Sequence, residues 1–366
     1  MDSEKNSKLS WGGALLIAVL VTVLAFFGAR LVARLQARNT FGTYALIELP
    51  NTQGLQVVGD GFIYYDGSSL TRIDSGGKTI WSSLIGANAS FDAQPSGVAV
   101  WSGDMLTLID WESGITESSS PMETDIVSAK LGSRYAAVLL APEHDGKVVL
   151  LETGGRQVDS IDASGLTVLS YGFFSDDSLF WMMSLDTSGT VPTCEISTYN
   201  PGKRIVGSIT DNEQLMYQVL FQSSQVCCAG VTHFKVYDYT GTENRDKRKL
   251  IYGWYLVSAD TESADPMMAY VLSSQYDAGE EMQDVRLLRS DTDEIVRMPF
   301  GCTALVAKEN RVYGFARDGT IMIAQAGRKR TEAYPTGLPI DRVYGVTNNG
   351  VAVVGNGTRL YLINLP

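Results

Sequence analysis

The sequence has few of the side chains that most often carry chemistry. Its 366 residues include only two histidines, His144 and His233, and four cysteines. None of the cysteines forms a C-x-x-C pair, so neither a zinc site nor a thioredoxin-like redox motif is indicated. No G-x-S-x-G elbow is present to support a hydrolase triad. A metal site built on both histidines would need two distant segments to meet, and we therefore expect no metal and no cofactor.

Positive charge is also scarce. The chain has 29 lysines and arginines against 41 aspartates and glutamates, a net charge of −12. Beyond residue 38 the imbalance is larger, with 24 basic and 39 acidic residues. Such a surface repels phosphate backbones and anionic lipid headgroups, so nucleic acid is not an expected partner. Cationic or neutral partners suit it better, and a solvated acidic surface with no charged partner is the alternative.

One long apolar run lies near the N-terminus. Residues 9–29, LSWGGALLIAVLVTVLAFFGA, carry no charge, and a helix of this length covers the roughly 30 Å core of a bilayer. Arg30, Arg34 and Arg38 follow in an amphipathic continuation instead of a signal-peptide cleavage site. We therefore predict a short tail at 1–8 and a transmembrane helix with a juxtamembrane extension at 9–38.

The orientation of this segment is weakly marked. Lys5 and Lys8 precede the run and three arginines follow it, a count that slightly favours a cytoplasmic C-terminal side. A single N-terminal span before a strand-rich domain is, however, the usual layout of an exported, membrane-anchored protein. We expect a single-pass protein of the cell membrane with its main domain outside the cytoplasm.

The rest of the chain repeats one pattern of short alternating strands and glycine turns. The stretch GDGFIYYDGSSLTRIDSGGKTIW, residues 59–81, predicts three strands joined by two turns. Similar stretches occur at 97–116, 145–161, 193–209, 233–243, 284–298, 311–329 and 350–365. The shared third strand ends at eight positions, 36 to 51 residues apart: Asp74, Asp110, Glu152, Asn200, Asp238, Arg289, Gln325 and Asn364.

Eight four-stranded units of about forty residues indicate an all-β, eight-bladed β-propeller over residues 43–366. Seven blades are the alternative, if residues 160–213 form one irregular blade. The last copy stops after its inner strands, whereas TYALIEL, residues 43–49, is a strand without a unit of its own. We predict that this strand pairs with the C-terminal blade and closes the ring, which removes two exposed sheet edges.

These units resemble those of the PQQ-like, or BamB-like, β-propeller superfamily, which includes the quinoprotein dehydrogenases. The resemblance rests on an apolar strand, a DG or GD turn, L-x-x-I-D, a glycine turn and a strand with Trp, seen best at 59–81 and 97–116. WD repeats fit less well, because Asp110 and Trp111 stand in the reverse order. The chain is also similar to membrane-anchored propellers of Gram-positive anaerobes, which implies a cell-envelope location and no particular activity.

Cys227 and Cys228 raise the question of a redox role. Quinoprotein alcohol dehydrogenases carry a vicinal disulfide against the PQQ ring, so the resemblance makes that one interpretation. In QVCCAGV, however, the pair falls within an apolar strand, where neighbouring side chains point to opposite faces of the sheet. Both faces of a blade are packed, and cysteine is often buried, so we expect two separate core thiols.

Loops hold the remaining candidates. The acidic stretches 176–177, 277–284 and 291–294 are expected to be exposed turns, although paired carboxylates could serve a glycosidase. Dense aromatic residues at 252–255 are expected mostly between blades. Phe173, Phe174, Asp176 and Asp177 share one loop and are the predicted partner contacts.

The favoured function is therefore a non-catalytic scaffold that binds protein or polysaccharide at the envelope. The alternative is an enzyme, either a degenerate PQQ-type oxidoreductase or a carbohydrate-active propeller.

Overall fold

The computed structural model describes most of the chain after residue 43. The described residues are 21, 22, 28, 42, 44–49, 52–141, 146–174, 179–222, 225–238, 240–261, 263, 266–277, 281–328 and 331–365. Among these residues no helix has both the length and the apolar character needed to cross a bilayer. The predicted span at 9–38 lies outside the described residues apart from three positions.

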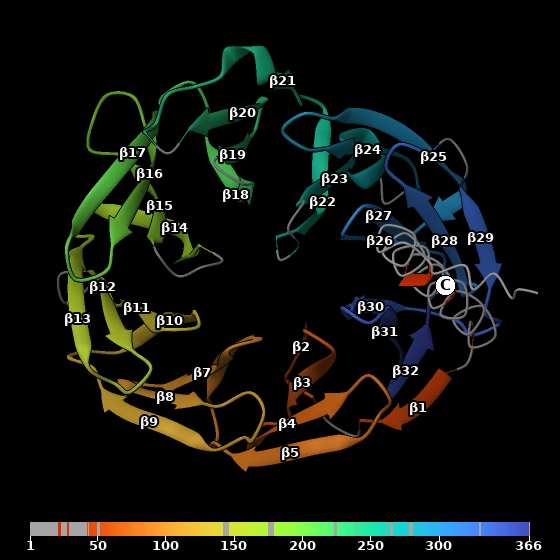
Figure 1. Ribbon diagram of the computed structural model, residues 1–366, viewed down its shortest axis with the longest axis horizontal. Helices are drawn as coiled ribbons and strands as arrows, with labels where there is room; N and C mark the ends of the chain where they lie inside the picture. The colour runs from red at the N-terminus through yellow and green to blue at the C-terminus, as the bar shows by residue number, and fades with distance from the viewer. Residues whose placement is uncertain are drawn as a thin grey trace, which may run out of the picture.

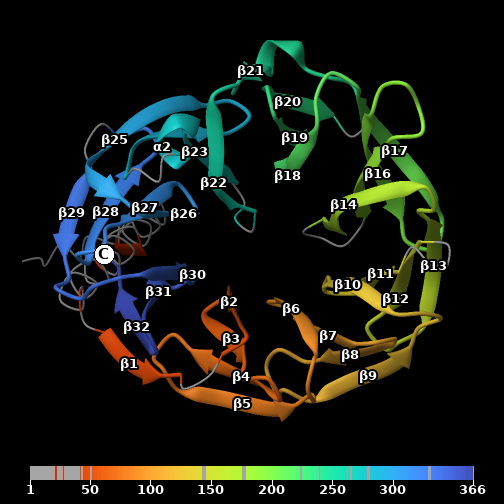
Figure 2. The same ribbon diagram turned by 180° about the vertical axis from the view of Figure 1, so that it is seen from behind.

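Eight four-stranded antiparallel sheets are arranged in a ring like the blades of a propeller (Figures 1 and 2). Blade 1 contains β2 (Gly54–Val58), β3 (Gly61–Tyr65), β4 (Ser69–Asp74) and β5 (Thr79–Leu84), and blade 2 contains β6 (Ser90–Gln94), β7 (Gly97–Ser102), β8 (Met105–Ile109) and β9 (Thr116–Pro121). Blade 3 contains β10 (Ile126–Leu131), β11 (Tyr135–Leu140), β12 (Lys147–Glu152) and β13 (Gln157–Asp162). Blade 4 contains β14 (Leu166–Phe173), β15 (Phe180–Asp186), β16 (Thr193–Asn200) and β17 (Arg204–Asp211).

The second half of the ring follows the same order. Blade 5 contains β18 (Met216–Gln222), β19 (Gln225–Gly230), β20 (His233–Asp238) and β21 (Lys249–Leu250), and blade 6 contains β22 (Trp254–Asp260), β23 (Met267–Leu272), β24 (Met282–Leu288) and β25 (Asp293–Cys302). Blade 7 contains β26 (Ala304–Lys308), β27 (Arg311–Phe315), β28 (Thr320–Gln325) and β29 (Glu332–Pro335). Blade 8 contains β30 (Arg342–Val346), β31 (Val351–Asn356), β32 (Arg359–Asn364) and β1 (Tyr44–Glu48). Two short helices, η2 (Arg245–Lys247) and α2 (Ser273–Asp277), lie in connections.

The prediction of eight blades is confirmed. Each of the eight repeat positions is either the last residue of the third strand of a blade or the residue directly after it. The stretch 160–213, on which the seven-bladed alternative depended, contains the complete blade 4. The turns after these positions explain the repeat: Asp74 accepts hydrogen bonds from the amides of Gly76 and Lys78, and Gly77 has a φ of +90°, which favours glycine.

The ring is closed by the first strand of the domain. β1 pairs antiparallel with β32 along its whole length, from Tyr44 opposite Ile363 to Glu48 opposite Arg359. Figure 1 shows β1, in red and orange, as the outer strand beside β32, in blue. Ala45 and Ile47 pack toward a core cluster between blades 8 and 1. Chain segments from opposite ends of the domain therefore form one sheet.

The core consists of eight apolar clusters, one at each junction between neighbouring blades. Middle strands such as β12 are buried nearly throughout because both faces of a blade are covered, whereas the outer strand β9 alternates between exposed and half-buried residues. Every junction thus depends on side chains from two blades.

The two faces of the ring differ in their connections. β1 begins, and β32 ends, on one face, which we call the proximal face. Because strands alternate in direction, every connection from an outer strand to the next inner strand lies on the opposite, distal face. The connections between the second and third strands lie there as well.

Candidate interaction surface

An exposed group of tyrosines and aliphatic residues covers the distal face of blades 5 and 6. We call it the tyrosine patch; its residues are Leu215, Tyr217, Val231, Tyr252, Tyr255 and Tyr276. All six are exposed, and Tyr252 exposes 74 % of its surface. They come from connections between strands or from the first two residues of the inner strands β18 and β22. An exposed apolar group of this kind is typical of an interaction site.

Direct contacts join the parts of the patch. The amide of Val231 donates to the carbonyl of Leu215 over 3.1 Å, and the amide of Ile251, next to Tyr252, donates to the carbonyl of Thr232 over 2.8 Å. The rings of Tyr255 and Tyr276 stack, with centroids 4.0 Å apart and planes 16° apart. The segments that carry the patch are therefore in direct contact with one another.

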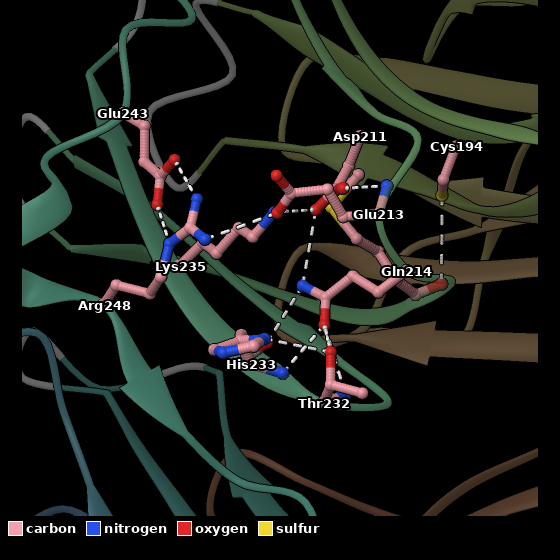
Figure 3. A network of polar contacts seen from close by, with 10 residues as sticks. Cys194, Asp211, Glu213, Gln214, Thr232, His233, Lys235, Glu243 and Arg248 are labelled. Carbon is pink, nitrogen blue, oxygen red and sulfur yellow. Dashed lines mark hydrogen bonds and ion pairs between the residues drawn. The ribbon is translucent and has the colours of Figure 1, made fainter.

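A polar network around Lys235 holds the blade 5 side of the patch (Figure 3). Lys235 lies in β20 and exposes only 2 % of its surface. Its Nζ lies 2.8 Å from Asp211 Oδ2 and 2.7 Å from Glu213 Oε2. Asp211 ends β17 and is also buried, whereas Glu213 lies in the exposed connection to β18. The ion pairs thus fix this connection against β20.

The network favours the charged form of every member. Burial alone would raise the pKa of Asp211, but hydrogen bonds from Lys235, from the Glu213 amide and from Gln214 outweigh it, so the pKa is lowered. Burial likewise acts to lower the pKa of Lys235, and the two carboxylates outweigh it, so that pKa is raised. The hydrogen bond from Lys235 lowers the pKa of Glu213. All three groups are therefore ionised at neutral pH.

Gln214 connects this network to the patch. Its Oε1 accepts hydrogen bonds from the amides of Thr232 and His233 at 3.1 and 2.8 Å, and its Nε2 donates to the His233 carbonyl at 3.0 Å. A Cβ atom at Gly230 would meet this amide at 2.2 Å, so the close approach requires glycine. Gln214 thus fixes the turn that presents Val231.

The outer side of blade 5 is irregular because β21 has only two residues. A loop containing η2 takes the place of the rest of an outer strand, and Arg248 donates to both oxygens of Glu243 at 2.6 Å. Arg248 also reaches Glu213 at 3.3 Å. These hydrogen bonds raise the pKa of Arg248 and extend the network to the rim of the blade.

Of the predicted partner contacts, Phe173 and Phe174 are described; both lie at the proximal end of β14, and they are not both exposed. Phe174 is buried, with its ring centroid 4.1 Å from that of Phe221 in blade 5. Phe173 is half-buried and packs against Tyr135 and Phe180. The expectation that both phenylalanines lie on the surface is therefore corrected for Phe174, because the neighbouring blade covers it. Asp176 and Asp177 lie outside the described residues, and a partner contact there stays a prediction.

The aromatic segment at 252–255 also differs from its expected place. Tyr252 and Tyr255 are exposed, and only Trp254 packs toward the cluster between blades 5 and 6. The sequence feature that could have predicted the exposure of Tyr252 is its position beside Gly253, at a turn between two strands. Strand periodicity alone favoured a core position for these aromatic residues.

The four cysteines are free and buried, which confirms the core position expected for Cys227 and Cys228. Cys227 packs in the cluster shared with blade 6 and Cys228 in the one shared with blade 4, so the two thiols point to opposite faces. Burial raises the pKa of Cys227 to about 12 and that of Cys228 well above its ordinary value.

We expect the four thiols, Cys194, Cys227, Cys228 and Cys302, to resist maleimide in the native protein at pH 8, because they are buried and protonated. Mass spectrometry should find no adduct before denaturation and four after it. Rapid native labelling of Cys227 or Cys228 would contradict the packing described here.

The acidic side chains of the described residues show no raised pKa, which a proton-donating carboxyl would need at neutral pH. Among the described residues, each carboxylate with a resolved shift has a lowered pKa. Turn hydrogen bonds cause this at Asp238, where Thr240 and Thr242 donate, and an ion pair with Lys247 is the main cause at Asp291. Within the same part of the chain, no three histidine, cysteine or acidic side chains are grouped as metal ligands.

Fold and surface together define a β-propeller of eight blades with an exposed patch on its distal face. No family model matches the sequence, and no curated protein matches it. Several solved structures are similar to this chain in fold. BamB from Moraxella catarrhalis gives a TM-score of 0.54 at 13 % identity, covering 88 % of this chain and 98 % of that one.

Two further structures show how widely the architecture is shared. The C-terminal WD40 domain of Sif2 gives a TM-score of 0.58 at 13 % identity, covering 88 % of this chain and 98 % of that one. The computationally designed Ika8 protein gives a TM-score of 0.55 at 14 % identity, covering 86 % of this chain and 98 % of that one. At these identities the similarity shows the fold alone.

Proposed function

We propose that this chain is a non-catalytic scaffold of the cell envelope, held at the membrane by residues 9–38, which binds another protein through the tyrosine patch. The observation that carries the proposal is the patch itself. Six exposed apolar and aromatic residues are gathered over two of the eight blades, and an ionic network around the buried Lys235 holds the blade 5 side. Tyrosine is favoured at protein interfaces because it combines a large apolar area with a polar tip.

The position of the patch suits a tethered protein. The domain begins on the proximal face at β1, so a tether before β1 would hold that face toward the membrane. The distal face, with the patch, would then face away from the membrane. The resemblance to membrane-anchored propellers of Gram-positive anaerobes supports the same location.

Photo-crosslinking in intact cells tests the binding. A photoreactive phenylalanine analogue at Tyr252 is expected to give a discrete protein adduct, because the side chain is exposed within the patch. The matched control is the same analogue at Leu84, which is 80 % exposed. Leu84 ends β5 in blade 1, across the ring from blade 5. An adduct from both positions, or from neither, would contradict a protein-binding role of the patch.

A cysteine reporter tests the location. All four native thiols are buried, so Glu117→Cys on the exposed outer strand β9 is expected to be the main site of labelling in the native protein. We expect a membrane-impermeant maleimide to label it in intact cells. Labelling only after lysis would place the propeller in the cytoplasm and refute an envelope role.

A further inference from the structure

We infer that the tyrosine patch takes a polypeptide segment in which arginine or lysine alternates with apolar residues. The inference rests on the proposed function and names the chemistry of the partner.

The basic side chains nearest to the patch are already engaged. Lys235 is bound to two carboxylates, and Arg248 to Glu243 and Glu213. Lys249 donates to backbone carbonyls of the turn in blade 6, with distances of 2.7 Å to Arg289 and 2.8 Å to Thr292. Lys235 and Arg248 together face three carboxylates, those of Asp211, Glu213 and Glu243, so this group is negative overall, and Lys249 is held by backbone carbonyls.

Arg286 is engaged in the same way. It donates to both oxygens of Asp293 at 2.8 and 2.7 Å, and to the carbonyl of Leu250 at 2.8 Å, in the segment that leads to Tyr252. Its guanidinium lies 5.5 Å from the centre of the Trp254 ring.

Negative charge remains at the edges of the patch. Glu213, beside Leu215, is more than half exposed although it binds Lys235 and Arg248. Glu281, the residue directly before β24 on the same distal face, is exposed as well. A cation that approaches the patch meets these carboxylates and the faces of tyrosine rings, both of which attract arginine and lysine. Aliphatic residues of the same segment can pack against Leu215 and Val231.

Two other occupants fit less well. A second copy of this chain would bring a surface of the same acidic character, which repels itself. An anionic membrane would meet the same repulsion. Both are separate outcomes of the test below.

The test is binding of short synthetic peptides to the purified full chain, measured by fluorescence anisotropy. A peptide that alternates arginine and leucine is expected to bind at least about tenfold more tightly than the same peptide with glutamate for arginine. Tyr252→Ala should weaken this binding by about tenfold, as expected for an exposed interface tyrosine, and added salt should weaken it too. Leu84→Ala is the control and should leave it unchanged.

Equal binding of the two peptides, or binding unaffected by Tyr252→Ala, would overturn the inference. Concentration-dependent dimerisation that Tyr252→Ala abolishes would also overturn it, as would tighter patch-dependent binding to phosphatidylglycerol vesicles. If the crosslinked adduct at Tyr252 forms while the peptides are not distinguished, the protein-binding role stands and only the partner chemistry fails. If no adduct forms in cells, the proposed function itself fails.

Discussion

Lys235→Met is expected to lower the free energy of unfolding by about 3–5 kcal/mol, the largest effect of any single substitution considered. The variant keeps the volume of the side chain but leaves Asp211 buried without its cation. A lone buried carboxylate must take up a proton or draw water into the junction between blades 4 and 5. Denaturant titration of the purified chain measures the loss.

Two further variants isolate the cause. Lys247→Met removes an exposed ion pair with Asp291 and should cost less than about 1 kcal/mol. Adding Asp211→Asn to Lys235→Met should restore most of the lost stability, because no buried charge is then left unpaired. A double variant that is less stable than either single variant would show that the cost comes from packing and not from charge.

The effect of Lys235→Met should depend on pH in a defined direction. The pKa of Asp211 is lowered in the folded protein, so its contribution is complete above its ordinary pKa and is lost as the pH falls through the lowered value. The pKa of Lys235 is raised, so its contribution persists to alkaline pH. The difference in stability between wild type and variant should therefore shrink as the pH falls, from the pH at which the lone Asp211 of the variant takes up its proton.

Ile47→Pro is expected to lower the free energy of unfolding by about 3 kcal/mol, since it combines the loss of a ladder hydrogen bond with the loss of a partly buried apolar side chain. The amide of Leu49 donates to the carbonyl of Thr358, so in the alternating ladder the amide of Ile47 also points toward β32. Proline removes that donor and weakens the strand that closes the ring.

Leu46→Pro provides the matched control one residue away. The amide of Leu46 points away from β32, and its side chain is exposed, so proline is tolerated on this edge. We expect a loss below about 1 kcal/mol. Equal losses in the two variants, measured by the same denaturant titration, would contradict a closing role for the ladder between β1 and β32.

Much of the fold could be predicted from the sequence because each blade repeats its own local physics. Strand alternation marks the outer strands, apolar runs mark the middle strands, and turns such as the one after Asp74 need a carboxylate and a glycine at fixed places. The opposite burial of Cys227 and Cys228 follows from the period of two in a strand whose two faces are both covered.

The interaction surface could not be predicted in the same way. Phe174 is in a loop by sequence, yet Phe221 of the next blade covers it, and local sequence does not show how far a neighbouring blade reaches. The tyrosine patch could not be predicted for a different reason, because its residues are far apart in the sequence. Tyr217, Tyr252 and Tyr276 come from separate strands and connections, and only the closed ring brings them onto one face.

The central claim is that the propeller binds its partner protein through the tyrosine patch on blades 5 and 6. The most direct test combines crosslinking with substitution. The photoreactive analogue is placed at Tyr252, in the wild-type background and in one carrying Tyr217→Ala and Tyr255→Ala. The account predicts one discrete protein adduct in the first background and its loss in the second, with equal amounts of folded protein in both. An adduct of undiminished yield in the second background would contradict the account, because binding would then not depend on the tyrosine patch.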